Sequence, residues 1–359
     1  MIENVPTADE LRTVSLRLYF KAWSEVTAIV TEWERFSGLA TPDWSPERGH
    51  FYLDTADSSG NEAISEWRDY IEAAQSDLQG IYTLIQQSQE IGLKARICDV
   101  SPYLLLKRTD IKPANSATNT WDFTDFPTID ASELVRVHNT FCSTVLSKEF
   151  QAMFDEIRRN RNKMHHLGIY RRALDPQVII DILQMHYPEL YPGRRWMEDR
   201  LHFATLHRWA NYADSDYNER SDLFHELWQL LPGLSEGQYR WLMGHGREEP
   251  RFICFSCSSD ARLGGHQPYE TDAPTAFQVG DTLEVRCVIC DGVYPMKAGT
   301  CPNDECESEL LSADEESEGK CMECGWSHEE WEEQMVRQKA YRSTSLDLLG
   351  LVGKKGDEA

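Results

Sequence analysis

The chain has 359 residues and a formal net charge of −24, so it is long enough for two or three domains and does not bind nucleic acid through overall positive charge. Residues 1–10 lack the basic start and apolar core of a signal peptide, and no stretch is apolar for long enough to span a bilayer. We therefore expect a cytoplasmic protein that makes no membrane contact.

The first part of the chain predicts long helices. Thr7 to Glu10 (TADE) fits a capping box, and apolar residues then recur at helical spacing as far as Phe36. A second helix is predicted from Asn61 to Ile91, where apolar residues recur three and four positions apart. Lys94 to Asp110 is compatible with either a strand or a helical turn.

A third helix is predicted after the polar loop that ends at Thr128. Asp130 to Glu133 can cap it, and apolar positions from Leu134 to Ile157 indicate one unbroken, buried helix. Pro176 can begin a further helix, and the helical pattern continues as far as Leu231.

The periodicity changes after Gly244 to Pro250, which resembles a linker in composition. Cysteine pairs and short strand-like segments such as Thr282 to Val288 then replace the helical pattern. Glu329 to Tyr341 predicts a charged helix, and Gly353 to Ala359 a frayed tail.

Eight of the ten cysteines stand in close pairs, which favours metal binding over disulfides in a chain expected in a reducing compartment. Because tetrahedral zinc takes four soft ligands, these cysteines predict two structural zinc ions in segments that resemble zinc ribbons. Sequential pairing gives one ion per set, and an interleaved pairing of the four short segments remains open. His328 is an alternative ligand at the second site, where the first two cysteines are widely spaced. The proposed ligands are Cys254, Cys257, Cys287, Cys290, Cys301, Cys306, Cys321 and Cys324.

A basic segment, Arg158 to Gly168 (RRNRNKMHHLG), ends the third predicted helix. It combines arginines, amides and two adjacent histidines. Arginine binds phosphate in a bidentate manner, and histidine is the side chain best suited to proton transfer near neutral pH. The segment therefore predicts a phosphate site, although a solvated helix end whose cations complement the helix dipole has the same composition.

Within this segment, Arg161, Asn162 and His166 resemble the motif of the HEPN superfamily, in which four to six residues separate Arg from His and a polar residue often directly follows the Arg. The resemblance covers this short motif and the general helical pattern of residues 1–175. It implies an all-α domain and, in many members, a metal-independent ribonuclease whose active site forms where two motifs meet in a homodimer. Such members are often toxins or antiviral effectors of prokaryotes.

The chemistry of metal-free RNA cleavage assigns the roles. A base takes the proton of the 2′-OH, and a cation stabilises the charge that develops on the phosphate. We expect His166 to be the base, Arg161 to hold the phosphate and Asn162 to orient the substrate. In a regular helix, however, Arg161 shares a face with His165 and not with His166. His165 is therefore the rival catalytic histidine, and His166 requires the helix to loosen before Gly168.

The sequence as a whole predicts a mainly α fold: a HEPN-like helical bundle over residues 1–175, a helical extension and linker over 176–250, a double zinc ribbon with short strands over 251–327, and a charged helix with a flexible tail over 328–359. Asp304 to Glu318 is an acidic run, which repels phosphate and favours a protein contact or a mimic of nucleic-acid charge at the ribbon. A solvated loop has the same composition. The expected function is RNA cleavage. The alternative is a non-catalytic adaptor or sensor that combines a helical interaction module with a zinc ribbon.

Overall fold

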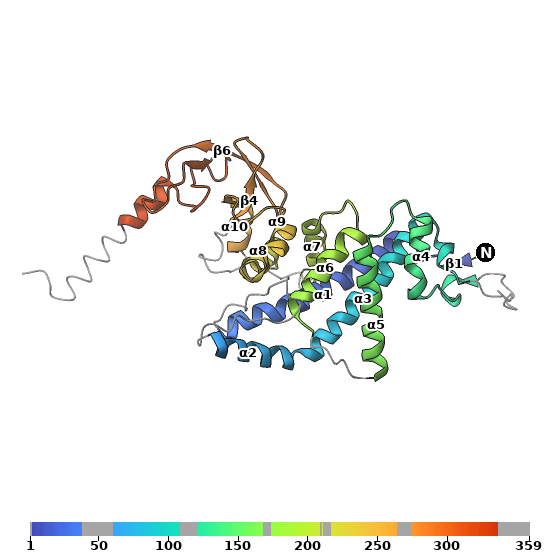
Figure 1. Cartoon of the computed structure of the whole chain (residues 1–359). Helices are drawn as coiled ribbons and strands as arrows, with labels where there is room; N and C mark the ends of the chain where they lie inside the picture. Colours follow the sequence, from blue (N-terminus) through green and yellow to red (C-terminus); the bar gives the residue numbers. More distant parts are fainter. Residues whose placement is uncertain are drawn as a thin grey trace, which may run out of the picture. The chain divides into compact units, whose positions relative to one another are not determined.

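The computed structural model describes residues 2–37, 60–107, 121–167, 174–208, 210, 217–263 and 274–336. The chain divides into two compact units, one of Met1–Ala213 with Gln229–Gly244 and one of Asp214–Trp228 with His245–Ala359. The first is mainly helical, and the second carries an antiparallel sheet and the paired cysteines, as the fold class predicted (Figure 1). Within the described ranges no helix is long and apolar enough to cross a membrane.

The first helix, α1 (Ala8–Ser37), begins at the predicted capping box. Thr7 Oγ1 accepts a hydrogen bond from the Glu10 amide at 3.2 Å, and the Glu10 carboxylate accepts one from the Thr7 amide at 2.8 Å. These reciprocal bonds satisfy amides that lack partners at a helix N-terminus. The apolar face of α1 then buries Tyr19, Phe20 and Trp23 almost completely.

The second predicted helix is divided into α2 (Gly60–Ala73) and α3 (Gln75–Val100), with a turn at Ala74. The helix also continues nine residues beyond the predicted end at Ile91. α3 packs along α1 (Figure 1) and buries Leu78, Ile81 and Ile85, which the periodicity had placed in the core. The ambiguous segment that follows contains a 3-10 turn, η2 (Pro102–Leu105).

The prediction of one unbroken third helix was wrong, because the chain forms α4 (Ala131–Phe141) and α5 (Lys148–Leu167). Residues 142–147 leave the helix, and the Asn139 side chain accepts a hydrogen bond from the Leu146 amide at 3.1 Å. Ser147 then caps α5 by accepting from the Phe150 amide at 3.1 Å. The apolar stripe was misleading here, since Val145 is 70% exposed and covers no core.

Two of the later helices begin at recognisable side-chain caps. Asp175 accepts a hydrogen bond from the Gln177 amide at 2.8 Å and starts α6, in which Pro176 is the first residue as predicted. Ser235 and Gln238 form a capping box at α9. The bounds are α6 (Pro176–Leu190), α7 (Trp196–Thr205), α8 (Glu219–Leu230), η4 (Leu231–Gly233) and α9 (Glu236–Met243), and α8 crosses the division between the units. A short parallel pair joins β1 (Ile2–Glu3) to β2 (Trp121–Asp122), beside η3 (Phe123–Asp125).

The second unit contains a five-stranded sheet whose strand order follows the chain. Every neighbouring pair is antiparallel, and the register sets Ala276 opposite Cys287. Phe252 and Val285 are buried on one face of the sheet, and Phe277 is buried on the other. The bounds are β3 (Arg251–Ile253), α10 (Phe255–Leu263), β4 (Pro274–Gln278), β5 (Glu284–Cys287), β6 (Val293–Ala298) and β7 (Leu310–Ser312). A helix at residues 328–336 follows, and the predicted tail lies outside the described residues.

Candidate metal centres and the basic helix end

The eight paired cysteines form two clusters that are consecutive in the chain. Cys254, Cys257, Cys287 and Cys290 make the first, and Cys301, Cys306, Cys321 and Cys324 make the second. Within each cluster all four Sγ atoms lie within 4.8 Å of one another. The pairing is therefore sequential and not interleaved. His328 belongs to neither cluster.

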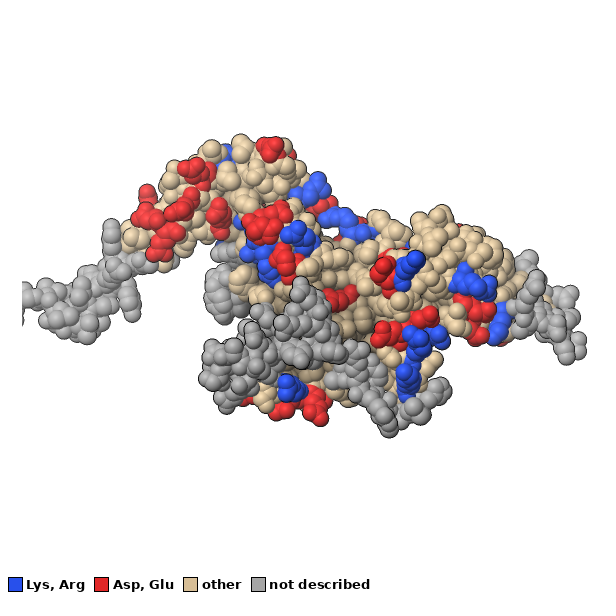
Figure 2. Space-filling view, viewed as in Figure 1, with Lys and Arg blue, Asp and Glu red and all other residues tan. Residues whose placement is uncertain are grey.

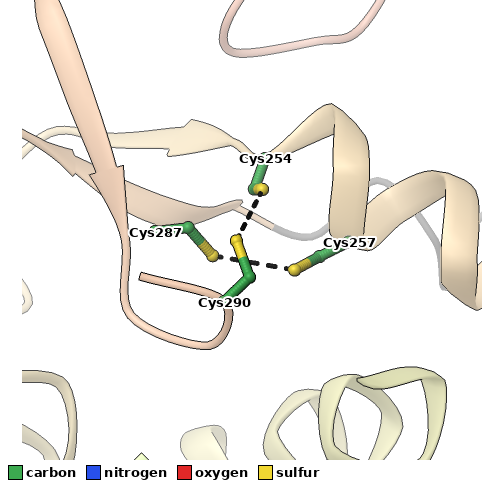
Figure 3. A group of neighbouring side chains, drawn as sticks. All are labelled: Cys254, Cys257, Cys287 and Cys290. Atoms are coloured by element: carbon green, nitrogen blue, oxygen red, sulfur yellow. Dashed lines mark hydrogen bonds between the residues drawn. The ribbon is translucent and has the colours of Figure 1, made fainter. Parts of the chain in front are cut away.

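The sulfur positions of the first cluster fit a tetrahedral zinc ion (Figure 3). The Sγ atoms of Cys254 and Cys290 are 3.8 Å apart, as are those of Cys257 and Cys287. A tetrahedron with Zn–S distances of about 2.3 Å has edges of about 3.8 Å. A disulfide would require about 2.05 Å, so these pairs are free thiols set at the spacing of metal ligands.

The sheet positions these four ligands. Cys254 follows β3, Cys257 lies in the first turn of α10, and Cys287 ends β5. Cys290 lies in the turn before β6, where the Asp291 amide donates to the Cys287 carbonyl at 3.0 Å. This turn places Asp291 in the left-handed region with φ of 60°. The end of β5 and the turn after it thus direct the Sγ atoms of Cys287 and Cys290 toward the centre of the cluster.

The second cluster has the same kind of turn. The Gly325 amide donates to the Cys321 carbonyl at 3.0 Å, and Gly325, which directly follows Cys324, takes a positive φ of 79°, as Asp291 does with 60° after Cys290. Glycine adopts this conformation without steric cost, and asparagine or aspartate does so more readily than other residues. The positions directly after Cys290 and Cys324 are therefore part of the two sites, and no motif in the sequence pointed to Asp291.

The wide spacing of Cys301 and Cys306 is closed by an additional turn. The Cys306 amide donates to the Asn303 carbonyl at 2.9 Å, and the Asn303 amide lies 3.4 Å from Cys301 Sγ. Cys301 and Cys324 have their sulfurs 3.4 Å apart, and Cys306 and Cys321 have theirs 3.8 Å apart. The second cluster therefore also fits one zinc ion, despite its unusual first pair.

The thiols of the first cluster influence one another's protonation. Hydrogen bonding with Cys254 raises the pKa of Cys257 well above its usual range, whereas hydrogen bonds from Cys254 and Cys257 lower the pKa of Cys290. Four thiolates at these distances would repel one another strongly, so a divalent cation is needed for all four to ionise. A zinc ion bound by four thiolates keeps no open position and is structural.

The second cluster has almost no apolar core of its own. Apart from its cysteines, the only buried hydrophobic residue packed with it in the described chain is Leu311. One leucine cannot offset the conformational entropy of ordering the surrounding loops. The metal is therefore the main stabilising element of this part of the second unit.

A backbone hydrogen bond joins the two metal clusters. The amide of Ile253, directly before Cys254, donates to the carbonyl of Met322 at 2.7 Å, and Met322 directly follows Cys321. Both side chains are 1% exposed. This bond therefore holds Cys254, a ligand of the first site, next to Cys321, a ligand of the second site, inside the second unit.

The basic segment lies at the end of α5, which continues as a helix through Leu167. The expected loosening of the helix before that point does not occur, so Arg161 and His165 are one turn apart on one side of the helix backbone. Arg161 donates a hydrogen bond to the Asn162 side chain at 3.1 Å. The side chains of His165 and His166, and Gly168, lie outside the described residues.

Arg161 occupies a core position of α5. The buried residues Phe150, Phe154, Ile157 and Met164 recur at helical spacing, and Arg161 falls between the last two on the same face. Its Nε atom is buried and has no hydrogen-bond partner, and it pairs with no carboxylate among the described residues. Polar groups in such positions are normally satisfied, so this guanidinium has capacity for an anionic ligand.

Comparisons with protein-family models, curated proteins and solved structures found no match to this chain. The fold and the clusters define a protein with a mainly helical unit and an antiparallel unit suited to two structural zinc ions.

Proposed function

We propose that the protein is a metal-independent endoribonuclease of the HEPN type, in which the helical unit cuts RNA and the zinc ions only stabilise the second unit. The observation that carries the proposal is Arg161, a cation on the apolar face of α5 with a buried Nε that has no partner in the described chain. A partly buried guanidinium without a carboxylate is costly, and a phosphate would compensate it with short, charge-assisted hydrogen bonds.

The neighbouring residues supply the remaining chemistry. Asn162 accepts a hydrogen bond from Arg161 and so restricts the guanidinium. The histidine of the motif takes the proton of the 2′-OH, the 2′ oxygen attacks the phosphorus, and the bond to the 5′ oxygen breaks. The products are a 2′,3′-cyclic phosphate and a 5′-hydroxyl, which takes up a proton from an imidazolium. A second copy of the motif in a homodimer supplies that acid.

Cleavage of purified total RNA, with mapping of the product ends, tests the proposal. We expect cleavage of RNA and not of DNA, in the absence of free magnesium. His166→Ala and Arg161→Ala should each lower the rate by about two to four orders of magnitude, the usual range for an acid–base group or a charge-stabilising donor. Asn162→Ala should have a smaller effect.

Two further variants decide between the alternatives. Lys163→Ala removes an exposed positive charge from the same turn, so it should cut as fast as the unmodified protein if general basicity is not the cause. His165→Ala distinguishes the regular helix from the family spacing, because it alone should abolish cleavage if His165 is the base. Full activity of both histidine variants would contradict the ribonuclease proposal, and the non-catalytic adaptor would then be the supported function.

The adaptor is supported by the charge of the second unit. Figure 2 shows acidic side chains gathered on the part of this unit that leads into residues 328–336. From Asp304 to Glu333 the chain has 13 acidic residues and one lysine, Lys320, which pairs with Glu330. Such a surface repels RNA and attracts a basic protein segment. The same surface lets a defence or toxin effector receive a protein regulator, so this binding role is also compatible with catalysis.

A further inference from the structure

A pocket lies in the first unit where one face of α1 meets α7 and the residues that precede it. It has a volume of about 170 Å³. Its walls on the α1 side recur at helical spacing, and the other walls come from Arg194 and one face of α7. The lining includes Arg12, Arg17, Arg194, Leu16, Phe203 and Leu206.

The charges of this pocket differ from those of the protein as a whole. Three arginines and His202 face two aspartates, in a chain whose net charge is −24. A group of cations is therefore concentrated at a hollow of an otherwise acidic molecule. A concavity with an excess of cationic side chains attracts anions, because its low-dielectric walls focus the field.

Two of the arginines are held in place, and the third has no counterion. Arg12 pairs with Asp99 at 2.7 Å and also with Asp9. Arg194 donates through Nε to Asp199 at 2.7 Å, and Asp199 also accepts from the Tyr187 hydroxyl at 2.6 Å. Arg17 is exposed and forms no ion pair within the described residues. The pocket thus has fixed guanidiniums and one that is open to a ligand.

Aromatic side chains form the apolar part. The ring centroids of Phe20 and Phe203 are 5.5 Å apart, and the Arg200 guanidinium lies 5.7 Å from the Phe203 centroid. An apolar cavity of about 150 Å³ can hold a benzene molecule, whereas drug-sized ligands need roughly 300 Å³ or more. The volume and the lining therefore suit a single aromatic ring.

We propose that this pocket binds a small anion with one aromatic ring, with the ring against Phe203, Leu16 and Leu206 and the phosphate or carboxylate on Arg17. Pyrimidine nucleoside monophosphates and simple aryl phosphates belong to this class, as do aromatic carboxylates. The proposal is independent of RNA cleavage, since the pocket residues are not part of the basic segment of α5.

Calorimetric titration of the full-length protein, with phenyl phosphate, cytidine monophosphate and benzoate as separate probes, tests this site. At least one probe should bind, and inorganic phosphate or benzyl alcohol should bind at least tenfold more weakly because each lacks one half of the ligand. Arg17→Gln should weaken binding of that probe about tenfold, which corresponds to about 1.4 kcal/mol. Thr13→Phe, at an exposed turn of α1, should fill the hollow and abolish binding.

Arg136→Gln is the matched control, since Arg136 is an exposed arginine on α4, outside the pocket. It should bind the probe as the unmodified protein does. The proposal is overturned if no probe binds at millimolar concentration, or if Arg17→Gln binds as tightly as Arg136→Gln. Equal binding of inorganic phosphate and phenyl phosphate would also overturn it, because the aromatic residues would then contribute nothing. The relative affinities of the phosphate and carboxylate probes identify the anionic group.

Discussion

His186 lies among buried aromatic and hydroxyl groups of the helical unit. It is fully buried, its ring is stacked against Tyr191, and its Nε2 lies 3.4 Å from Ser88 Oγ. Burial lowers the pKa of His186 to about 3 and raises that of Tyr191 to about 12. Both side chains are therefore neutral over the range in which an unfolded histidine titrates.

This buried histidine makes folding sensitive to acid. Its folded-state pKa lies below the unfolded value of about 6.5, so the unfolded chain binds the extra proton and stability falls as pH drops below about 6.5. Between pH 6.5 and 5 the loss should be about 2 kcal/mol. His186→Gln should remove this part of the pH dependence, as measured by urea unfolding of both proteins at the two pH values. Parallel pH dependence of the two proteins would mean that His186 does not titrate as its burial implies.

At the scale of elements, the break between α4 and α5 depends on the cap at Ser147. Replacing Ser147 with alanine removes the acceptor for the Phe150 amide and should destabilise the helical unit by about 1 kcal/mol. Ser143→Ala is the matched control, because Ser143 is exposed in the same segment and makes no hydrogen bond within the described residues. Urea unfolding followed by helical circular dichroism compares them, and equal midpoints would argue against the cap.

The sequence predicted those elements whose local signals agree with their packing. The capping box at Thr7, the proline at the start of α6 and the cysteine pairs are local, so they identified two helices and both metal clusters. The break between α4 and α5 was not predicted, because Phe141 and Val145 continue the apolar spacing although each is more than half exposed. Periodicity counts apolar residues, but only the tertiary fold decides which of them are covered.

The sites show the same limit. Cysteine spacing gave the ligands, but it could not decide between sequential and interleaved pairing, which depends on how the strands bring the turns together. The pocket between α1 and α7 was not predicted at all, because Arg17 and Phe203 are far apart in the chain and neither belongs to a motif. Arg194, which pairs with Asp199, also lines this pocket without belonging to a motif.

At the scale of the whole molecule, we expect two zinc ions per chain and two different responses to their removal. Elemental analysis of protein purified under reducing conditions should give both ions. A strong chelator should unfold the second unit, whose second cluster has Leu311 as its only buried apolar partner in the described chain, and leave most of the helical signal of the first unit. Finding a single zinc ion per chain would contradict this expectation. So would a near-ultraviolet circular dichroism spectrum that does not change when the chelator is added.

The hydrogen bond from Ile253 to Met322 bears on how the metals are gained and lost. When one site loses its ion, the backbone next to its cysteine is no longer held in place and this hydrogen bond weakens. The cysteine of the neighbouring site then loses a bond that helps to orient it. Occupancy should therefore be cooperative. In a zinc titration, native mass spectrometry would then detect mainly the metal-free and the two-zinc forms, and the one-zinc form would stay scarce at every ratio of metal to protein. A cell short of zinc would hold a mixture of intact and unfolded second units in place of a uniform, half-loaded population.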